Sequence, residues 1–166
     1  MLKYLLLSVG DNEDEAFDIV KESVRHHNML LKFVQDLERI VTIPILKQYL
    51  DAIACMGLYL YMLQVDFQFL HLFSLLTNLS QTLFFSIFGQ LIQDKSLAIA
   101  DAAYESNWQN LQNRKVRKAV ILIIQRAQAR SQITAGGFIT LSFESFAVML
   151  KTAASFLAVL RSSKEN

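Results

Sequence analysis

Charged and hydrophobic residues occupy different parts of this sequence. Between Gln48 and Asp94 there is neither lysine nor arginine, although the chain contains 16 of them. A soluble helical bundle would carry charge on every exposed helix face. We therefore expect the central stretch to lie within a membrane, with polar segments before and after it.

Three segments are apolar and long enough to cross a bilayer as helices, because about 20 residues at a rise of 1.5 Å cover roughly 30 Å of hydrocarbon. The first, residues 44–64, begins at the only proline. The second, residues 66–93, carries the longest charge-free run, which starts after Asp66. The third, residues 137–160, follows a pair of glycines that we expect to be a flexible break.

Polar helices are predicted on either side of these segments. Residues 1–43 hold a capping box, Asn12 with Glu15, and then hydrophobic residues at a 3.6-residue period, which predicts an amphipathic helix in water. Residues 94–132 include a cationic amphipathic helix whose apolar middle is too short to span a bilayer. Because cations favour the cytoplasmic side, both regions are predicted to be cytoplasmic and the tail, residues 161–166, extracellular.

The predicted fold class is all-α: a polytopic membrane helical bundle with three transmembrane helices and long cytoplasmic helical extensions. The hydrophobic content of 53% agrees with this, since soluble domains are roughly 45–50% apolar. A soluble helical interaction module, with its apolar helices packed in a core, is the alternative. The charge-free run argues against it.

No pattern in the sequence indicates catalysis, a cofactor or a metal site. There is no nucleophile elbow, phosphate-binding glycine loop or cysteine-histidine metal spacing. His26 and His27 are adjacent and would point to different sides of a helix, which makes a two-ligand metal site improbable. Cys55, the only cysteine, lies in an apolar stretch and is expected to be a buried, inert thiol. A net charge of +1 gives no indication of a nucleic-acid partner.

Five short motifs occur in this chain in a characteristic order. They are His27 leading into Leu30-Leu31-Lys32-Phe33, Ala102-Ala103-Tyr104-Glu105-Ser106-Asn107-Trp108, Arg126-Ala127-Gln128, Ala135-Gly136-Gly137-Phe138, and Leu141-Ser142-Phe143-Glu144-Ser145-Phe146. In order and spacing the chain resembles the C-terminal third of insect odorant receptors, whose topology places the C-terminus outside. The three spans would then be the fifth, sixth and seventh helices of that family, and the sequence would be a fragment of a seven-span protein.

The resemblance implies an odorant receptor subunit of a ligand-gated, non-selective cation channel that works in olfactory detection. The implied partners are shared co-receptor subunits in a hetero-oligomer, a tetramer in the family, together with small volatile odorants and the lipid bilayer. The implied location is the plasma membrane, with several passes. Two alternatives stay open: a small three-span membrane scaffold or assembly protein without channel activity of its own, and a gustatory-type chemoreceptor.

In the family, the last helix lines the pore. A stripe of small, polar or branched residues lies within about ±40° on its helical wheel, and it could serve equally as a helix-packing face. The stripe consists of Ser145, Val148, Thr152, Ser155 and Val159. Val159 matches the family's gate position, where a hydrophobic constriction can dewet. Lys151 would repel cations, so we expect it to face a neighbouring helix and pair with Glu144.

The resemblance also implies an odorant pocket to which the second span contributes. One face of that span presents an apolar and aromatic wall with a few hydrogen-bonding groups, which suits small volatile ligands, although a helix interface would use the same face. These residues are Phe67, Leu70, His71, Ser74, Thr77 and Asn78. Tyr104 and Trp108 are implied to form the packing core of a cytoplasmic anchor between subunits. A lipid-binding or calmodulin-type role for the cationic helix Arg114–Arg130 is the less favoured interpretation.

Overall fold

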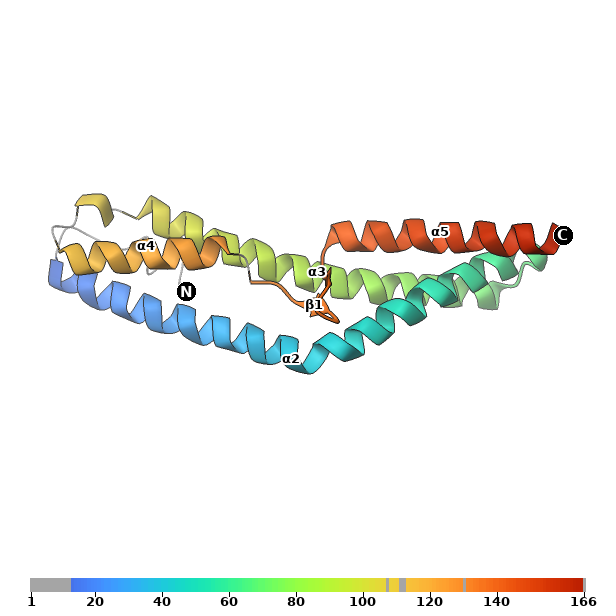
Figure 1. Cartoon of the computed structure of the whole chain (residues 1–166), viewed down its shortest axis with the longest axis horizontal. Coiled ribbons are helices and arrows are strands. Elements are labelled where there is room, and N and C mark those ends of the chain that lie inside the picture. The colour runs from blue at the N-terminus through green and yellow to red at the C-terminus, as the bar shows by residue number, and fades with distance from the viewer. Residues whose placement is uncertain (1–12, 107, 111–112, 130, 166) are drawn as a thin grey trace. The chain divides into compact units, whose positions relative to one another are not determined.

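The computed structural model describes residues 13–106, 108–110, 113–129 and 131–165. These residues form four α-helices, one 3₁₀ turn and a two-stranded hairpin (Figure 1). The elements are α2 (Glu13–Val65), α3 (Phe69–Glu105), η1 (Trp108–Asn110), α4 (Arg114–Gln128), β1 (Thr134–Ala135), β2 (Ile139–Thr140) and α5 (Phe143–Glu165). The predicted all-α class is confirmed. The capping box expected at Asn12 lies outside the described residues.

Two helices continue beyond the limits that the sequence suggested. α2 passes through Pro44, where we expected one segment to end and another to begin. A proline removes one backbone hydrogen bond, and in a helix of 53 residues the bonds on either side keep the helix continuous. α3 continues past residue 93 to Glu105, because the polar residues that follow the apolar run are still good helix formers.

Three helices are long and apolar enough to cross a membrane, judged by length and composition. The stretches are Phe17–Val65 in α2, Phe69–Glu105 in α3 and Phe143–Ser162 in α5. The number of candidate spans therefore agrees with the prediction from the sequence. The apolar part of α2 follows its charged first half, whose cations and carboxylates include Lys21, Arg25, Lys32, Asp36 and Arg39.

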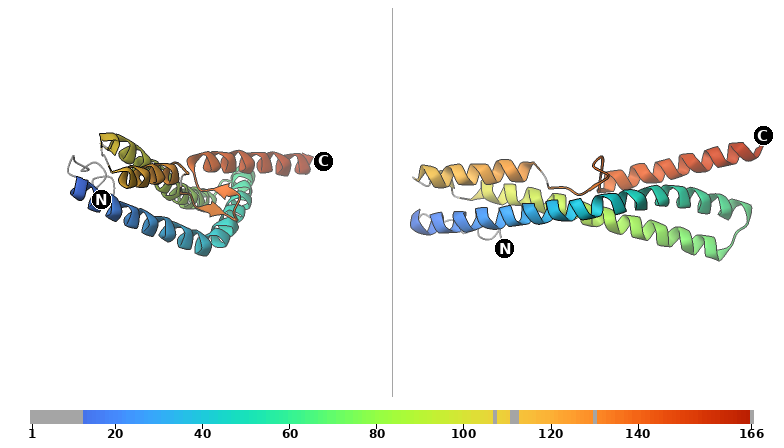
Figure 2. Two further views of the ribbon diagram at one scale, coloured as in Figure 1. Left: turned by 60° about the vertical axis from the view of Figure 1, so that its left-hand side comes forward. Right: turned by 60° about the horizontal axis from the view of Figure 1, so that its bottom comes forward.

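The chain divides into two compact units. The first unit contains residues 13–37 of α2 together with Leu91–Gln132, and the second contains Glu38–Gln90 together with residues 133–165. Both α2 and α3 therefore contribute to each unit. Figure 2 shows the elements of each unit from two further sides.

The first unit encloses an aliphatic core. Its buried members are Val20, Ala102, Ala103, Val116, Val120 and Ile123. α4 is strongly amphipathic, so its aliphatic face enters this core and its cationic face remains outside. Asn113 caps α4 by accepting the backbone N–H of Lys115 at 3.0 Å. Ser96 on α3 donates to the carbonyl of Ala127 at 3.3 Å and so ties the end of α4 to α3.

The second unit is held together by close helix approaches and hydroxyl groups. Tyr49 on α2 and Ser86 on α3, both fully buried, form a hydrogen bond of 3.1 Å. Gly57 lies so close to Phe156 of α5 that a Cβ atom there would be 2.2 Å from the ring. Small residues at such positions let membrane helices approach closely, where no hydrophobic force draws helices together.

A short hairpin precedes α5, and it is the main feature that the sequence did not predict. Thr134 pairs with Thr140, and Ala135 pairs with Ile139, in antiparallel register. The two glycines of the turn have positive φ angles, 66° and 83°, a conformation that glycine adopts without strain. The glycine pair is thus a defined turn, and α5 begins at Phe143 rather than directly after the glycines.

One face of α2 holds this hairpin. Thr134 donates to the Glu38 carboxylate at 2.5 Å, and the backbone N–H of Gly136 donates to the carbonyl of Thr42 at 3.1 Å. The side chain of Leu46 lies under Gly136. Glu38, Thr42 and Leu46 are spaced four residues apart, so they lie on one side of the helix.

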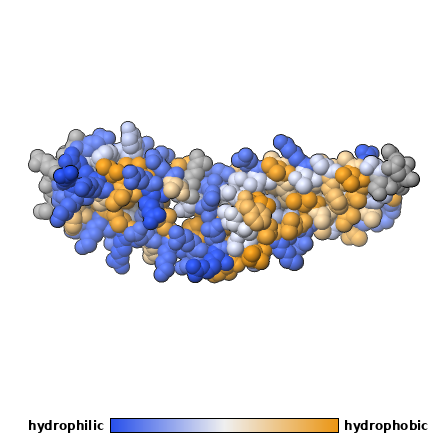
Figure 3. Space-filling view, viewed as in Figure 1, coloured by the Kyte–Doolittle hydropathy of each residue, from blue (hydrophilic) through white to orange (hydrophobic). Residues whose placement is uncertain are grey.

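The two units differ in the surface that they expose. Figure 3 shows mostly hydrophilic side chains over the first unit and hydrophobic side chains along α5 in the second. Exposed large hydrophobic residues of the second unit include Leu50, Leu70, Phe73, Leu76, Phe84, Phe88 and Val159. Exposed apolar surface on this scale is what a lipid-facing bundle presents.

Candidate functional site

The stripe predicted to line a pore is open to the surroundings in the second unit. Val148 and Val159 are 56% and 63% exposed, and the side chains of Thr152 and Ser155 are exposed as well. Ser145, nearest the start of α5, is half-buried. The stripe therefore stays uncovered by the other helices of its own unit.

A face of α5 about 90° around the helix from the stripe packs against the rest of the second unit. Met149 and Ala153 are both 2% exposed, and Phe156 approaches Gly57 on α2. α5 starts at a cap, since the Ser142 hydroxyl accepts the backbone N–H of Ser145 at 3.2 Å. The contacts on this face fix which side of α5 remains free.

The hydroxyl groups of the stripe donate to their own helix. Thr152 donates to the carbonyl of Val148 at 2.9 Å, and Ser155 donates to the carbonyl of Lys151 at 3.0 Å. Such bonds to the preceding turn are common for serine and threonine in helices. They leave the oxygen lone pairs of both hydroxyls available on the exposed face.

Lys151 and Glu144 do not form the ion pair that we expected from the sequence. Both side chains are exposed, and no salt bridge joins them within the described part of α5. Seven residues correspond to about 10 Å along a helix, which is too far for two side chains on one face to meet easily. Lys47 and Asp51 on α2, four residues apart, do pair, at 3.1 Å.

The wall predicted to contact odorants is partly covered. Phe67 precedes α3, and both Phe67 and Leu70 are exposed. His71, Ser74 and Asn78 are half-buried, and Thr77 is exposed and donates to the carbonyl of Phe73 at 2.9 Å. The Oδ1 atom of Asn78 is buried and has no hydrogen-bond partner among the described residues.

An open groove lies on a neighbouring face of α3. It has a volume of about 540 Å³ and is lined by Phe73, Leu76, Thr77, Ser80, Gln81 and Phe84. Thr77 is the only residue of the predicted wall that lines it. The groove is mostly apolar and wide open, as expected for a helix surface that faces lipid or another helix.

The two residues predicted for a subunit anchor lie in the first unit. Trp108, in η1, packs against the aliphatic core, whereas Tyr104 is 64% exposed. Trp108 is thus part of the core within this chain, and Tyr104 is free to contact another surface. Cys55 is half-buried, so this thiol is less enclosed than we expected.

Comparison with known proteins gives the family. Residues 2–154 match the family model described as 7tm Odorant receptor. The chain is 28% identical over 160 residues to Odorant receptor Or2 of Anopheles gambiae, covering 94% of this chain and 42% of that protein. It is 27% identical to Odorant receptor 22c of Drosophila melanogaster, covering 92% of this chain and 40% of that protein.

A third relative, Odorant receptor 85c of Drosophila melanogaster, is 29% identical over 147 residues, or 84% of this chain and 37% of that protein. The chain therefore spans about 40% of the length of these curated relatives. The match to the family model covers the first two candidate spans, the hairpin and the first part of the third span. Together with the helical, membrane-suited fold, it shows that this chain belongs to the insect odorant receptor family.

Proposed function

We propose that this chain forms the pore-lining part of an odorant receptor subunit in a ligand-gated, non-selective cation channel. The shared co-receptor completes the hetero-oligomer, which lies in the plasma membrane. Membership of the odorant receptor family and three candidate membrane spans support the proposal. The excess of cations before the first span and between the second and third supports a cytoplasmic first unit and an extracellular C-terminus.

The exposed stripe of α5 is the observation that carries the proposal. A helix face that its own chain leaves open is available to line a passage shared with other subunits. Thr152 and Ser155 supply wettable positions, and Val159 supplies a hydrophobic ring when several subunits contribute it. Lys151 lies about 80° around the helix from Val159, so its charge is directed away from the centre of this stripe.

The half-buried side of α3 supports an odorant site in the same subunit. The unpartnered Oδ1 atom of Asn78 accepts a hydrogen bond from a ligand that carries a hydroxyl group. His71 and Ser74 lie on the same side of the helix and add polar groups to an otherwise apolar wall. A mostly apolar site with a few hydrogen-bonding groups suits small volatile molecules.

The pore proposal can be tested by cysteine accessibility. A receptor carrying this chain is expressed with the co-receptor in a Cys55→Ala background, and odorant-evoked current is recorded before and after a cationic thiol reagent. Val148→Cys and Ser155→Cys are expected to lose most of the current. The Val159→Ala variant is expected to change gating, because it weakens the hydrophobic constriction.

The matched control is Ala153→Cys, on the buried face of the same helix. Its current is expected to persist, because the reagent cannot reach a residue that is 2% exposed. Equal modification at Ala153 and Ser155 would contradict the assignment of the stripe. Surface expression without any odorant-evoked current would favour a three-span scaffold instead.

A further inference from the structure

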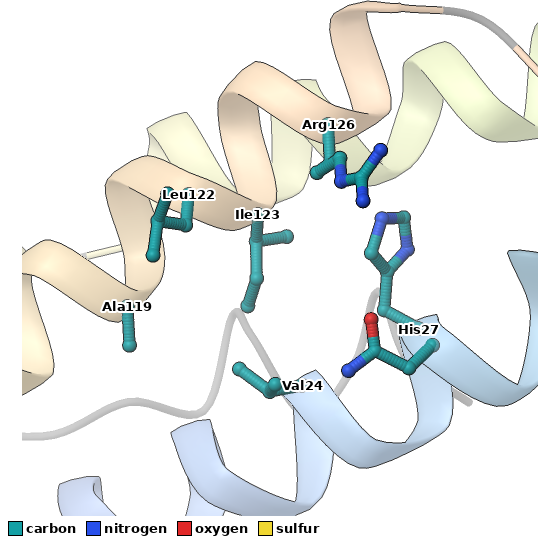
Figure 4. A pocket seen from close by; sticks show the side chains of 7 residues that line it. Val24, His27, Ala119, Leu122, Ile123 and Arg126 are labelled. Atoms are coloured by element: carbon teal, nitrogen blue, oxygen red, sulfur yellow. The ribbon is translucent and has the colours of Figure 1, made fainter.

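A pocket in the first unit belongs neither to the α5 stripe nor to the α3 wall. It lies between α2 and α4 and has a volume of about 240 Å³ (Figure 4). Its lining residues are Val24, His27, Asn28, Ala119, Leu122, Ile123 and Arg126. Four of these are aliphatic and three are polar, so the pocket combines an apolar body with a polar end.

His27 is the unusual group in this pocket. Its side chain is 4% exposed, and neither ring nitrogen has a hydrogen-bond partner among the described residues. Figure 4 shows the ring pointing toward the Arg126 guanidinium. Buried polar atoms are nearly always paired, so a ring whose two nitrogens lack a partner among the described residues is a group that a bound molecule can pair with.

The surroundings of this imidazole favour its neutral form. Burial lowers the pKa of His27, and the positive charge of Arg126 lowers this pKa further. His27 lies in the charged first half of α2, ahead of residues 44–64, the segment that the sequence predicts to span the membrane. A neutral imidazole has one N–H donor and one nitrogen acceptor on different edges of the ring, so one bound group pairs with one of them.

Arg126 adds a fixed positive charge at the mouth of the pocket. Its side chain is exposed, and a guanidinium presents a planar fork of donors that matches phosphate and carboxylate oxygens. The Asn28 amide, which also lines the pocket, both donates and accepts. The polar end is therefore suited to an anion, and it contains no carboxylate among its lining residues.

We propose that this pocket binds the phosphate monoester head of a small amphiphile, with the first carbons of its apolar part against Val24 and Ile123. A monoanionic phosphate has acceptor oxygens and one P–OH donor, so it can pair with whichever ring nitrogen of His27 faces it, the N–H or the acceptor. A carboxylate has acceptors only and can pair with the N–H alone. The volume equals that of about eight water molecules, enough for a phosphate and a few carbons.

The source of the phosphate is either a membrane lipid or a soluble organic phosphate, since both present the same head group. This inference does not depend on channel activity. It uses residues of the first unit, and binding can be measured whether or not the chain conducts ions.

Binding is tested with the full chain in nanodiscs of uncharged lipid. Hexyl phosphate is titrated while the imidazole nitrogen signals of His27 are followed by NMR, and inorganic phosphate serves as the head-only probe. Hexyl phosphate is expected to saturate and to shift both nitrogen signals. Inorganic phosphate is expected to bind about tenfold more weakly, because it leaves the apolar wall uncovered.

Two variants distinguish a specific binding site from a general attraction of hexyl phosphate to cationic side chains. Arg126→Gln is expected to weaken hexyl phosphate binding about tenfold or more, because it removes a charge-assisted hydrogen bond. The matched control is Lys118→Gln, which removes the same charge from an exposed position of α4 outside the pocket. A loss of less than about twofold is expected there, as for a screened surface charge.

His27→Leu tests the role of the ring without endangering the fold, because it removes two unpaired buried nitrogens and keeps a similar volume. This variant is expected to fold and to lose binding. Equal affinities for Arg126→Gln and Lys118→Gln, or binding that His27→Leu leaves unchanged, would overturn the proposal. Nanodiscs with phosphatidic acid distinguish the sources: competition with hexyl phosphate identifies a lipid head group, and undiminished hexyl phosphate binding identifies a soluble phosphate.

Discussion

The two units of this chain expose different kinds of surface. The first unit encloses aliphatic side chains and keeps its charges outside, as proteins in water do. The second unit exposes Phe73, Phe84 and Val159 and buries the hydroxyl groups of Thr82 and Ser86. Because lipid is as apolar as a leucine side chain, the second unit depends on close approach and hydrogen bonding instead of hydrophobic burial. Along their length, the helices α2 and α3 thus face two different environments.

The largest expected effect tests close approach in the second unit. A Cβ atom at Gly89 would lie 2.3 Å from both the Cβ and the carbonyl oxygen of Leu141. Gly89→Ala therefore forces backbone to move, and we expect a loss of about 3 kcal/mol in the free energy of unfolding in detergent. Gly57→Ala, which meets only the Phe156 ring, is expected to lose less because a ring can turn aside. Equal losses would show that close backbone contact is not what holds this unit.

A second test compares burial in the two units. Val120 is 0% exposed in the aliphatic core, so Val120→Ala is expected to cost about 2 kcal/mol, measured by hydrogen exchange of the α4 amides. Leu76 of the second unit is 49% exposed, and Leu76→Ala is expected to change stability in nanodiscs by less than about 0.5 kcal/mol. If Leu76→Ala proved as costly as Val120→Ala, the contrast between the units would be lost.

A third test concerns the buried hydroxyl pair. Ser86 donates to the carbonyl of Thr82 at 3.0 Å, so the Tyr49 hydroxyl is the donor in the bond to Ser86. Tyr49→Phe is expected to destabilise the second unit by about 1 kcal/mol, as for one neutral hydrogen bond. A double-mutant cycle with Ser86→Ala measures the coupling between the two side chains. A coupling energy near zero would mean that the bond contributes nothing.

The smallest effect is a pH dependence confined to the first unit. Because burial and Arg126 lower the pKa of His27, the unfolded chain takes up a proton at this residue before the folded chain does. Stability is then complete above pH 6.5, the ordinary histidine pKa, and falls as the pH drops below it. Hydrogen exchange of α4 between pH 7 and pH 5 is expected to show this loss after correction for the intrinsic rates, and His27→Leu is expected to reduce it. An unchanged slope in that variant would assign the loss to another group.

The membrane-spanning helices could be predicted from the sequence because lysine and arginine are absent from a long central stretch. The ends of the helices could not, since Pro44 removes only one hydrogen bond and the residues after Asp94 are polar yet helix-forming. The hairpin escaped prediction because strands of two residues show no alternating pattern. Its position depends on Glu38, almost 100 residues earlier in the chain.

The candidate sites were predictable to different degrees. The α5 stripe follows from helical spacing alone, and its exposure agrees with that pattern, while its function as a pore remains a proposal. The pocket around His27 could not be foreseen, because Arg126 lies on a different helix and nothing in the local sequence indicates that the two side chains meet. The motif that contains each residue was visible, but their proximity is a property of the fold.

The hydrogen bonds that the hydroxyl groups of α5 donate determine which sign of charge the exposed stripe of this helix favours. The single hydroxyl hydrogen of Thr152, and that of Ser155, is used in a hydrogen bond to the carbonyl of an earlier residue. What both groups direct outward is therefore the negative end of a dipole. Several copies of such a face around one axis would form rings of oxygen lone pairs, which attract and partly replace the hydration of a passing cation and offer nothing to an anion.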